Sequence, residues 1–483
     1  MLGDAPVARA LAQGVLSQLM AKTEPLTFWE HATAGEAHLL LGQTALARQS
    51  YAIAYEQAPD DAGNVATMRR QVNLLVRVLP EAAEVLDLLP PAAVLAFAGH
   101  LMDAPGRAAP RFPHGLEPAV EAAIRAHLSR LKQPTVYTSA ACGADLIFIE
   151  AALDLGAEVN VVMPFDRQDF VRTSVAVGGE AWVQRFDRAL ARAARLIWAT
   201  EESYLGDEVL FDHAAWLMEG LSVLRASQLQ TVPELLCVID PEANGDVGGA
   251  LATFERWQQL HGTPQVIDLR ALRSGTAQNI LAPSMPSADA APALTSADAK
   301  ALASRPQRTL KTMLFADFSG FGRLHDAFAP LFHARFLAIV AAQIEACAVK
   351  PLEANTWGDA LYVVFAEPRD AAEFALSLLA RMLEVDWTAA GLSETSQIRI
   401  ALHAGPVFCG FDPIMGRDNY FGSSVTKTAR IEPVTPPGMV YVSEAFAATL
   451  AATGQDDFTF EYMGTLALAK GYGESRIYRL ERG

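Results

Sequence analysis

The stretch MLFADFSGFGRL, residues 313–324, begins as an apolar run and ends in a turn of glycine and aromatic residues. A single carboxylate, Asp317, lies between the two parts. A short continuous apolar run bounded by glycines is typical of a buried strand. The glycines after Asp317 allow backbone N–H groups to approach a bound polyphosphate closely. The stretch therefore predicts a strand that ends at a phosphate-binding turn.

A second aspartate in this half of the chain is Asp359, in the turn of the hairpin-like segment LEANTWGDALYVVFA. Carboxylates at neighbouring strand ends are hard oxygen ligands, which suit Mg²⁺ or Mn²⁺ and especially a two-metal phosphate site. An aspartate at a strand end is more often a turn or cap residue, so neither Asp317 nor Asp359 alone establishes a metal site.

The region around these aspartates, residues 307–483, alternates strands with helices. We expect helices over residues 325–348, 369–384 and 422–432, with strands TLKTMLFADF and SQIRIALHAGPVFCG on either side of the hairpin. Strands paired through hairpins, with helices on one face, indicate an α+β domain.

Six motifs occur in order in this region: FADFSGF, WGDALYVVF, ALHAGPVFCG, NYFGSSVTKTARIE, PPGMVYVS and LAKGYG. Together they resemble the catalytic domain of the class III nucleotidyl cyclases, the adenylate and guanylate cyclases, over residues 308–481. The resemblance implies a ferredoxin-like α+β fold. It also implies a homodimer that converts a nucleoside triphosphate into a 3′,5′-cyclic monophosphate and pyrophosphate, with the active site between the two domains.

The resemblance also assigns roles to individual residues. Two ions of Mg²⁺ or Mn²⁺ per active site would be held by Asp317, Asp359 and the backbone of Phe318, and would activate the ribose 3′-hydroxyl group. The substrate phosphates would lie against Gly320 and Phe321.

Two further sites of the family fall late in the chain. Lys470, in LAKGYG, matches a lysine that contacts the phosphates, although a solvated lysine before a turn is also consistent with the pattern. Arg430 matches the arginine that stabilises charge on the reacting phosphate. Thr426 stands where the family usually has asparagine. A catalytically impaired nucleotide-binding module is therefore the alternative to an active enzyme.

The base of the substrate is left open by the sequence. The positions that read the base in adenylate and guanylate cyclases fall at Asn355 and Asn419, and neither purine pattern is present. The resemblance favours adenylate as the commonest product of the family, and pyrimidine cyclases of antiphage signalling depart from the purine pattern in the same way. Trp357, beside the turn, is expected in the core rather than against a base.

Residues 90–270 contain short β-rich runs separated by amphipathic helices: AAVLAFAG, PTVYTSA, AEVNVVMPF, ARLIWAT, ELLCVID and TPQVIDL. Continuous apolar strands between helices predict an α/β domain with a doubly wound parallel sheet. The segments resemble the Rossmann-like SLOG superfamily, whose catalytic PGGxGTxxE signature is absent. We expect a nucleotide-like ligand here rather than catalysis, and a tight turn without ligand is the alternative. The candidate ligand residues are Gly99, Arg107, Arg111, Gly143 and Asp145.

Residues 1–85 are rich in alanine and leucine and predict an α-helical, repeat-like region. Small residues at Gly35, Ala47 and Ala54, with Tyr51 between them, resemble one tetratricopeptide repeat and imply a protein partner. Residues 271–306 are rich in Ala, Ser and Pro and predict a linker. The fold class is therefore multidomain.

Composition limits the remaining possibilities. The net charge of −17 argues against nucleic acid or an anionic membrane as a partner. No apolar run is long enough to span a bilayer. The four cysteines are far apart in the sequence and indicate neither a disulfide framework nor a zinc site. These features favour a cytoplasmic protein.

Overall fold

The protein is described here from a computed structural model that covers residues 5–276 and 307–483, apart from residues 60, 105–106, 108–109, 243–247, 394 and 455–456. The chain divides into two units. One unit comprises Met1–Leu95, Ser129–Thr135 and Leu224–Glu234, and the other comprises Ala96–Leu128, Val136–Val223 and Leu235–Gly483. None of the described helices is long and apolar enough to cross a membrane.

The N-terminal region is helical, as predicted. Its helices are α1 (Ala5–Met20), α2 (Phe28–Leu40), α3 (Thr44–Gln57), α4 (Ala62–Val76) and the 3₁₀ helix η1 (Pro80–Leu88). Helix α2 begins at a capping box, in which Thr27 and Glu30 satisfy each other's backbone N–H groups.

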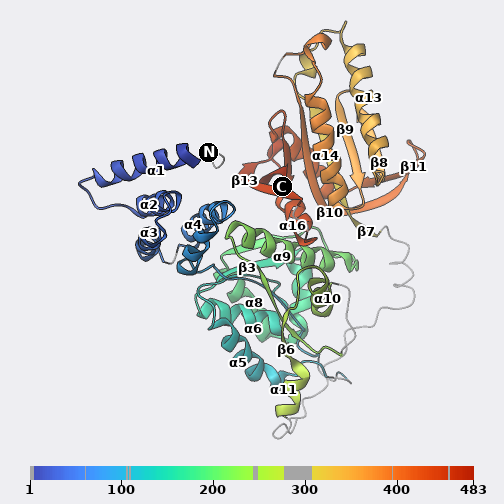
Figure 1. Cartoon of the computed structure of the whole chain (residues 1–483). Helices are drawn as coiled ribbons and strands as arrows, with labels where there is room; N and C mark the ends of the chain where they lie inside the picture. Colours follow the sequence, from blue (N-terminus) through green and yellow to red (C-terminus); the bar gives the residue numbers. More distant parts are fainter. Residues whose placement is uncertain are drawn as a thin grey trace. The chain divides into compact units, whose positions relative to one another are not determined.

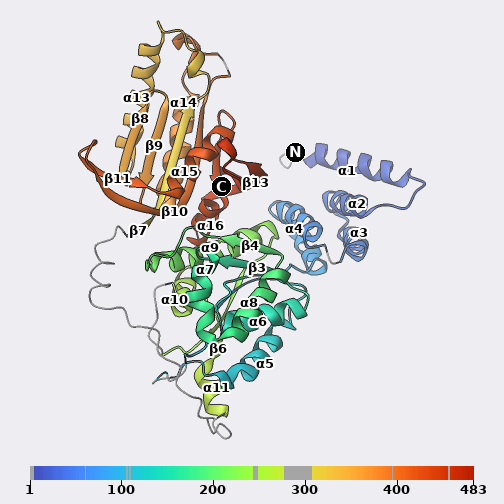
Figure 2. The same cartoon turned by 180° about the vertical axis from the view of Figure 1, so that it is seen from behind.

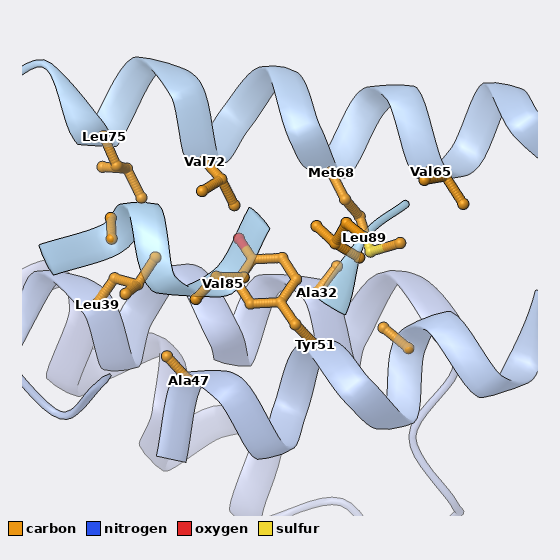
Figure 3. Close-up of a cluster of buried hydrophobic side chains, with 12 residues drawn as sticks. Ala32, Leu39, Ala47, Tyr51, Val65, Met68, Val72, Leu75, Val85 and Leu89 are labelled. Carbon is orange, nitrogen blue, oxygen red and sulfur yellow. The ribbon is translucent and has the colours of Figure 1, made fainter. Parts of the chain in front are cut away.

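The close approach of α2 and α3 depends on Gly35 and Tyr51. A Cβ atom at Gly35 would lie 2.6 Å from the Tyr51 ring, so only glycine leaves room for that ring. Tyr51 is fully buried with Ala47 and Ala54, and α4 adds apolar side chains such as Val72 to the same cluster (Figure 3). The predicted helical packing around Tyr51 is therefore confirmed.

The central region forms a six-stranded sheet in the order β4-β3-β2-β1-β5-β6. Strand β1 lies inside the sheet, with β2 to β4 on one side and β5 and β6 on the other, which is a doubly wound arrangement. The pairs β3/β4 and β5/β6 are parallel. All six predicted strands are present: β1 (Val94–Gly99), β2 (Thr135–Thr138), β3 (Glu158–Met163), β4 (Arg195–Trp198), β5 (Glu234–Ile239) and β6 (Gln265–Asp268).

Helices lie between these strands in the sequence, and α11 follows the last strand. They are α5 (Glu117–Leu128), α6 (Ala144–Asp154), α7 (Arg167–Phe170), α8 (Glu180–Arg192), α9 (Val209–Gln228), α10 (Ala250–Leu260) and α11 (Leu269–Thr276). The predicted linker begins too early, because its first residues, 271–276, belong to α11. The rest of the predicted linker, residues 277–306, lies outside the described residues.

The C-terminal sheet has the order β13-β14-β12-β10-β7-β9-β8, with β11 paired to β10. Strand β9 is antiparallel to both β7 and β8, and β10 is antiparallel to β7. Helix α13 connects β7 to β8 and α14 connects β9 to β10, which gives the predicted ferredoxin-like βαββαβ order (Figure 1). The bounds are β7 (Arg308–Phe318), α13 (Ala329–Ala346), β8 (Glu353–Trp357), β9 (Ala360–Phe365), α14 (Pro368–Leu383) and β10 (Ile398–Asp412).

Later strands extend this sheet, and further helices accompany them. They are β11 (Arg417–Phe421), α15 (Ser423–Ile431), β12 (Val440–Ser443), α16 (Glu444–Ala452), β13 (Phe458–Ala467) and β14 (Glu474–Arg482), with short 3₁₀ helices η5 (Phe321–Arg323), η7 (Glu432–Val434) and η8 (Ala469–Gly471). The β10–β11 hairpin projects from the sheet in both views (Figures 1 and 2). The end of β7 is fixed by an aromatic cluster in which the Phe318 ring meets Phe332 and Trp387 edge to face.

Candidate active site

Asp317 lies at the end of β7, between the neighbouring strands β9 and β10. Its neighbours Ala316 and Phe318 are buried, whereas the Asp317 side chain is 24% exposed and reaches the rim of the sheet. Strand alternation explains this difference, because successive side chains point to opposite faces. The carboxylate is therefore anchored by a buried strand and still open to a ligand.

Asp359 reaches the same place from the tight turn between β8 and β9. Trp357 and Ala360 are paired across that hairpin, so the turn consists of Gly358 and Asp359, and Gly358 has a left-handed φ of +67°. The carboxyl group of Asp359 shares a hydrogen bond with Asp317 and accepts another from the backbone N–H of Phe318. Burial, together with the charge of Asp317 and this hydrogen bond, raises the pKa of Asp359 to about 7.

The glycine turn after Asp317 has the geometry that the sequence suggested. Gly320 is left-handed, with φ +93°, and a Cβ atom there would lie 2.6 Å from the Ser396 hydroxyl oxygen. Phe321 then begins η5. A side chain at position 320 would therefore be strained in its backbone and crowded against Ser396.

Arg430, Thr426 and the Lys470 loop form a second group. Arg430 and Thr426 are four residues apart on α15, and the Thr426 hydroxyl donates to the Gly422 carbonyl oxygen at 3.4 Å. The Lys470 side chain is exposed, and its loop contacts α15 through Tyr472, whose hydroxyl donates to the Ser423 carbonyl oxygen at 3.4 Å.

The two groups have no direct polar contact in the described part of the chain. Among the residues that the structure describes, no hydrogen bond or ion pair joins the Asp317 group to Arg430, Thr426 or Lys470.

Asn355 on β8 and Asn419 on β11 are brought near each other by two contacts. Arg417 Nη2 lies 2.5 Å from Glu353 Oε1. Because Arg417 is two residues before Asn419 and Glu353 is two residues before Asn355, this contact joins β11 to β8 close to both asparagines. The Tyr362 hydroxyl, on the residue paired with Asn355, donates to the Tyr420 carbonyl oxygen at 3.4 Å.

The orientation of the two amides is set by their own backbone. Asn355 Oδ1 accepts a hydrogen bond from the Thr356 N–H at 2.9 Å, and Asn419 Oδ1 accepts one from the Tyr420 N–H at 2.8 Å. The Asn419 NH₂ group donates to Asp412 Oδ2 at 3.3 Å in the same hairpin, whereas no acceptor for the Asn355 NH₂ group occurs among the described residues. The prediction for Trp357 is wrong: it is 58% exposed, because it ends β8 next to the turn.

Comparison with known families identifies the C-terminal region. The family model described as the adenylate and guanylate cyclase catalytic domain matches residues 305–482. These residues are an adenylate and guanylate cyclase catalytic domain. The sequence resemblance over residues 308–481 is thereby confirmed for this region.

Individual relatives resemble the cyclase domain alone. Guanylate cyclase 2G of Mus musculus is 29% identical over 182 residues, a match that covers 35% of this chain and 16% of that protein, so the chain spans 16% of this relative's length. The guanylate cyclase domain of RhGC from Catenaria anguillulae, solved with GTP, is 19% identical with a TM-score of 0.31, covering 36% of this chain and 96% of that one. The adenylyl cyclase CyaB from P. aeruginosa is 19% identical with a TM-score of 0.33, covering 37% and 97%.

The sequence interpretation missed two charged residues of the cyclase domain. Arg399 lies directly opposite Asp317 on β10, with Nη2 2.6 Å from Asp317 Oδ2, and its Nε lies 2.5 Å from Glu432 Oε1. Burial raises the pKa of Glu432 to about 7, against the lowering effect of Arg399. The one signal in the sequence was a lone arginine inside the apolar strand IRIALHAG.

The candidate ligand residues of the central region occupy different places. Asp145, in the first turn of α6, is buried, and its carboxylate accepts the N–H groups of Ala141, at 3.2 Å, and Gly99. Burial raises the pKa of Asp145 to about 7. The Asp145 carboxylate therefore accepts hydrogen bonds from backbone N–H groups that would otherwise be available to a bound phosphate.

A cavity of about 140 Å³ lies at this edge of the central sheet, lined by Gly99 and Asp145 among apolar side chains that include Phe97, Val162 and Phe170. Gly143 is packed into its turn, since a Cβ atom there would lie 2.5 Å from the Met102 nitrogen. Neither Arg107, which lies 3.5 Å from Asp103, nor Arg111 lines the cavity.

Proposed function

We propose that the protein is a nucleotidyl cyclase, which converts a nucleoside triphosphate into a 3′,5′-cyclic monophosphate and pyrophosphate. The observation that carries this proposal is the hydrogen-bonded pair of Asp317 and Asp359 at one rim of a cyclase domain. Two carboxylates in contact repel each other when both are ionised, and a divalent cation between them removes that repulsion.

The donor set fits Mg²⁺ or Mn²⁺. Asp317, Asp359 and the Phe318 carbonyl would supply hard oxygen ligands. No group of three or more acidic, histidine or cysteine side chains suited to a metal occurs in the described part of the chain, so phosphate oxygens of the substrate would complete the coordination. Two bound ions would supply the charge that makes the ribose 3′-hydroxyl nucleophilic and stabilises leaving pyrophosphate.

The chain's own residues would position the triphosphate. The turn at Gly320 and Phe321 lets backbone approach the phosphates, and the exposed ammonium group of Lys470 would pair with them. Arg430 would stabilise the charge that develops on the α-phosphate during in-line attack. The Thr426 hydroxyl is bonded to the Gly422 carbonyl oxygen, so we expect no contact between this hydroxyl and the ribose.

The likeness of residues 305–482 to the cyclase catalytic domain supports a homodimer. Asp317 and Asp359 of one chain would face Arg430, Thr426 and Lys470 of a second chain, so that a symmetric pair contains two complete sites. The helical region and the central region would regulate this pairing, the first through a protein partner and the second through a ligand in the central cavity. Because the Asp145 carboxylate already uses the N–H groups there, we expect that ligand to be uncharged at this point.

The amide orientation favours a base that presents carbonyl oxygens. With its Oδ1 engaged by backbone, Asn355 offers its NH₂ group as a donor, which suits a carbonyl oxygen of guanine or uracil rather than the amino groups of adenine or cytosine. The Asn419 NH₂ group already donates to Asp412 Oδ2 at 3.3 Å. GTP or UTP is therefore the proposed substrate, in place of the adenylate that the family resemblance alone favours.

One observation supports the alternative of a nucleotide-binding module without turnover. The Thr426 hydroxyl is already bonded within its own helix, where the family's asparagine would reach toward the substrate. Such a module would bind nucleotide and release no pyrophosphate.

The proposed activity is tested by incubating the full chain with ATP, GTP, CTP or UTP and Mn²⁺, and by identifying cyclic products by mass spectrometry. Asp317→Asn keeps the shape of the side chain and is expected to abolish the product. Asp326→Asn is the matched control, because Asp326 is exposed and lies outside the site. Absence of any cyclic product from the wild type, with nucleotide binding retained, would favour the module.

A further inference from the structure

Arg399 connects the metal-binding rim to the end of α15. Its guanidinium group contacts Asp317 through Nη2 at 2.6 Å and Glu432 through Nε at 2.5 Å. Glu432 follows α15 directly and its side chain is 13% exposed, whereas Arg399 and Asp317 are 25% and 24% exposed. The three side chains therefore form one chain of charges that runs from the interior to the rim.

The strand register fixes this arrangement. Arg399 and Asp317 are directly opposite each other on the antiparallel strands β10 and β7, so their side chains emerge on the same face. A guanidinium group is planar and carries five N–H donors, so it can hold two carboxylates in different directions at once. An ammonium group has the same charge but no such fork.

We propose that Arg399 is a positioning residue of the metal site, and that Glu432 anchors it. By holding Asp317 Oδ2, Arg399 fixes the rotamer of the carboxylate and directs its other oxygen toward Asp359. This inference rests on the proposed function, because it takes Asp317 to be a metal ligand. Partners that orient a ligating carboxylate typically change metal affinity about 10–100-fold when they are removed.

A purely structural ion pair is the competing explanation, and the same sheet contains a matched example. Arg479 on β14 is directly opposite Glu461 on β13, and Arg479 Nη2 lies 2.6 Å from Glu461 Oε2. This pair has the same strand relationship and distance, with glutamate in place of aspartate, and it lies on β13 and β14 at one edge of the sheet, whereas β7 and β10 are internal strands.

The test measures Mn²⁺ binding to the full chain by electron paramagnetic resonance, with Mn²⁺ alone and with Mn²⁺ plus pyrophosphate. Arg399→Lys keeps the charge and removes the fork, and it is expected to raise the Mn²⁺ dissociation constant about 10-fold or more. Arg479→Lys is expected to leave that constant unchanged. Unchanged or tighter Mn²⁺ binding in Arg399→Lys would overturn the proposal, because Arg399 would then be a structural or competing counterion.

Two further variants keep the result interpretable. Glu432→Gln retains an oxygen acceptor for Arg399 Nε and removes the carboxylate charge, so it should weaken Mn²⁺ binding less than Arg399→Lys does. If Arg399→Lys does not fold, Glu432→Gln replaces it as the test. Mn²⁺ binding by Glu432→Gln that equals wild-type binding would then count against the proposal. Asp317→Asn distinguishes a failure of the proposed metal site from a failure of the proposed role of Arg399. If Asp317→Asn binds Mn²⁺ like the wild type, the proposed metal site fails. If only Asp317→Asn loses Mn²⁺, the proposed metal site stands and the role of Arg399 fails.

Discussion

The carboxyl groups of Asp317 and Asp359 share a hydrogen bond, although Asp317 ends a strand and Asp359 occupies a hairpin turn. Strand β9 joins the two positions, because it pairs with β7 on one side and with β8 on the other. The fold thereby brings two acids to one point, where their charges repel each other when both are ionised.

The stability of the protein without metal should depend on the protonation of Asp359. Its pKa rises from an ordinary value of 3.8 to about 7 in the folded chain, so the folded state binds more protons than the unfolded state between these values. Stability contributed by this proton is therefore present at low pH and is lost as pH rises through about 7.

Asp359→Asn should remove this dependence, because the amide stays neutral at every pH. In EDTA we expect Asp359→Asn to raise the Tm at pH 8 by about 2 °C or more, and to change it less at pH 5. Thermal melts of both proteins at the two pH values measure this. An equal shift at both values would contradict the assignment of the proton to Asp359.

Gly35→Ala should destabilise the helical region. The new Cβ atom would lie 2.6 Å from the fully buried Tyr51 ring, so the ring or the helices must shift, and overpacking of this kind costs about 1–3 kcal/mol. Gly14→Ala is the control, since no atom lies within 4 Å of a Cβ there and alanine favours the helix by about 1 kcal/mol. Urea unfolding of the full chain, followed by circular dichroism, should show opposite shifts for the two variants.

Asn355→Asp should change the preferred base. The carboxylate keeps the acceptor for the Thr356 N–H and replaces the NH₂ donor with a second acceptor, which suits the amino group of adenine or cytosine. We expect the ratio of kcat/KM for ATP over GTP, and for CTP over UTP, to rise about 10-fold. Asp418→Asn, an exposed neighbour of Asn419, should leave both ratios unchanged.

Thr426→Asn should raise kcat if the shorter side chain limits the present enzyme. The threonine hydroxyl is bonded to Gly422, and an asparagine amide reaches further from the helix, so a new hydrogen bond to the substrate would increase kcat about 3- to 10-fold. Thr426→Val should retain the wild-type kcat, because it removes only the bond within the helix. A large loss of kcat in Thr426→Val would show that the threonine hydroxyl already acts on the substrate.

Much of the fold could be read from local patterns. The six central strands were predicted from apolar runs. Strands β1, β2, β3 and β5 are almost entirely buried, whereas the edge strands β4 and β6 are partly exposed. Gly35, Ala47 and Ala54 were singled out because small residues allow two helices to approach closely, whereas the contact of the Tyr51 ring with Gly35 is seen only in the structure. Asp317 was found because it ends an apolar run, and Asp359 because it lies in the turn of a hairpin-like segment.

Other features depend on contacts that a sequence does not display. Arg399 could not be linked to Asp317 without the register of β10 against β7. The amide orientation of Asn355 comes from a hydrogen bond to its own strand, and Trp357 is exposed because β8 stops there. Residues 271–276 continue a helix although their composition resembles a linker.

The most direct test of a catalytic site shared between two chains is complementation. Asp317→Asn and Arg430→Ala are each expected to be inactive, because each removes a different half of both sites. Mixed in equal amounts and allowed to exchange chains, they should form mixed dimers with one intact site and regain about a quarter of the wild-type rate of cyclic nucleotide formation. No recovery on mixing, while the wild type is active and chain exchange is demonstrated, would contradict a site shared between two chains.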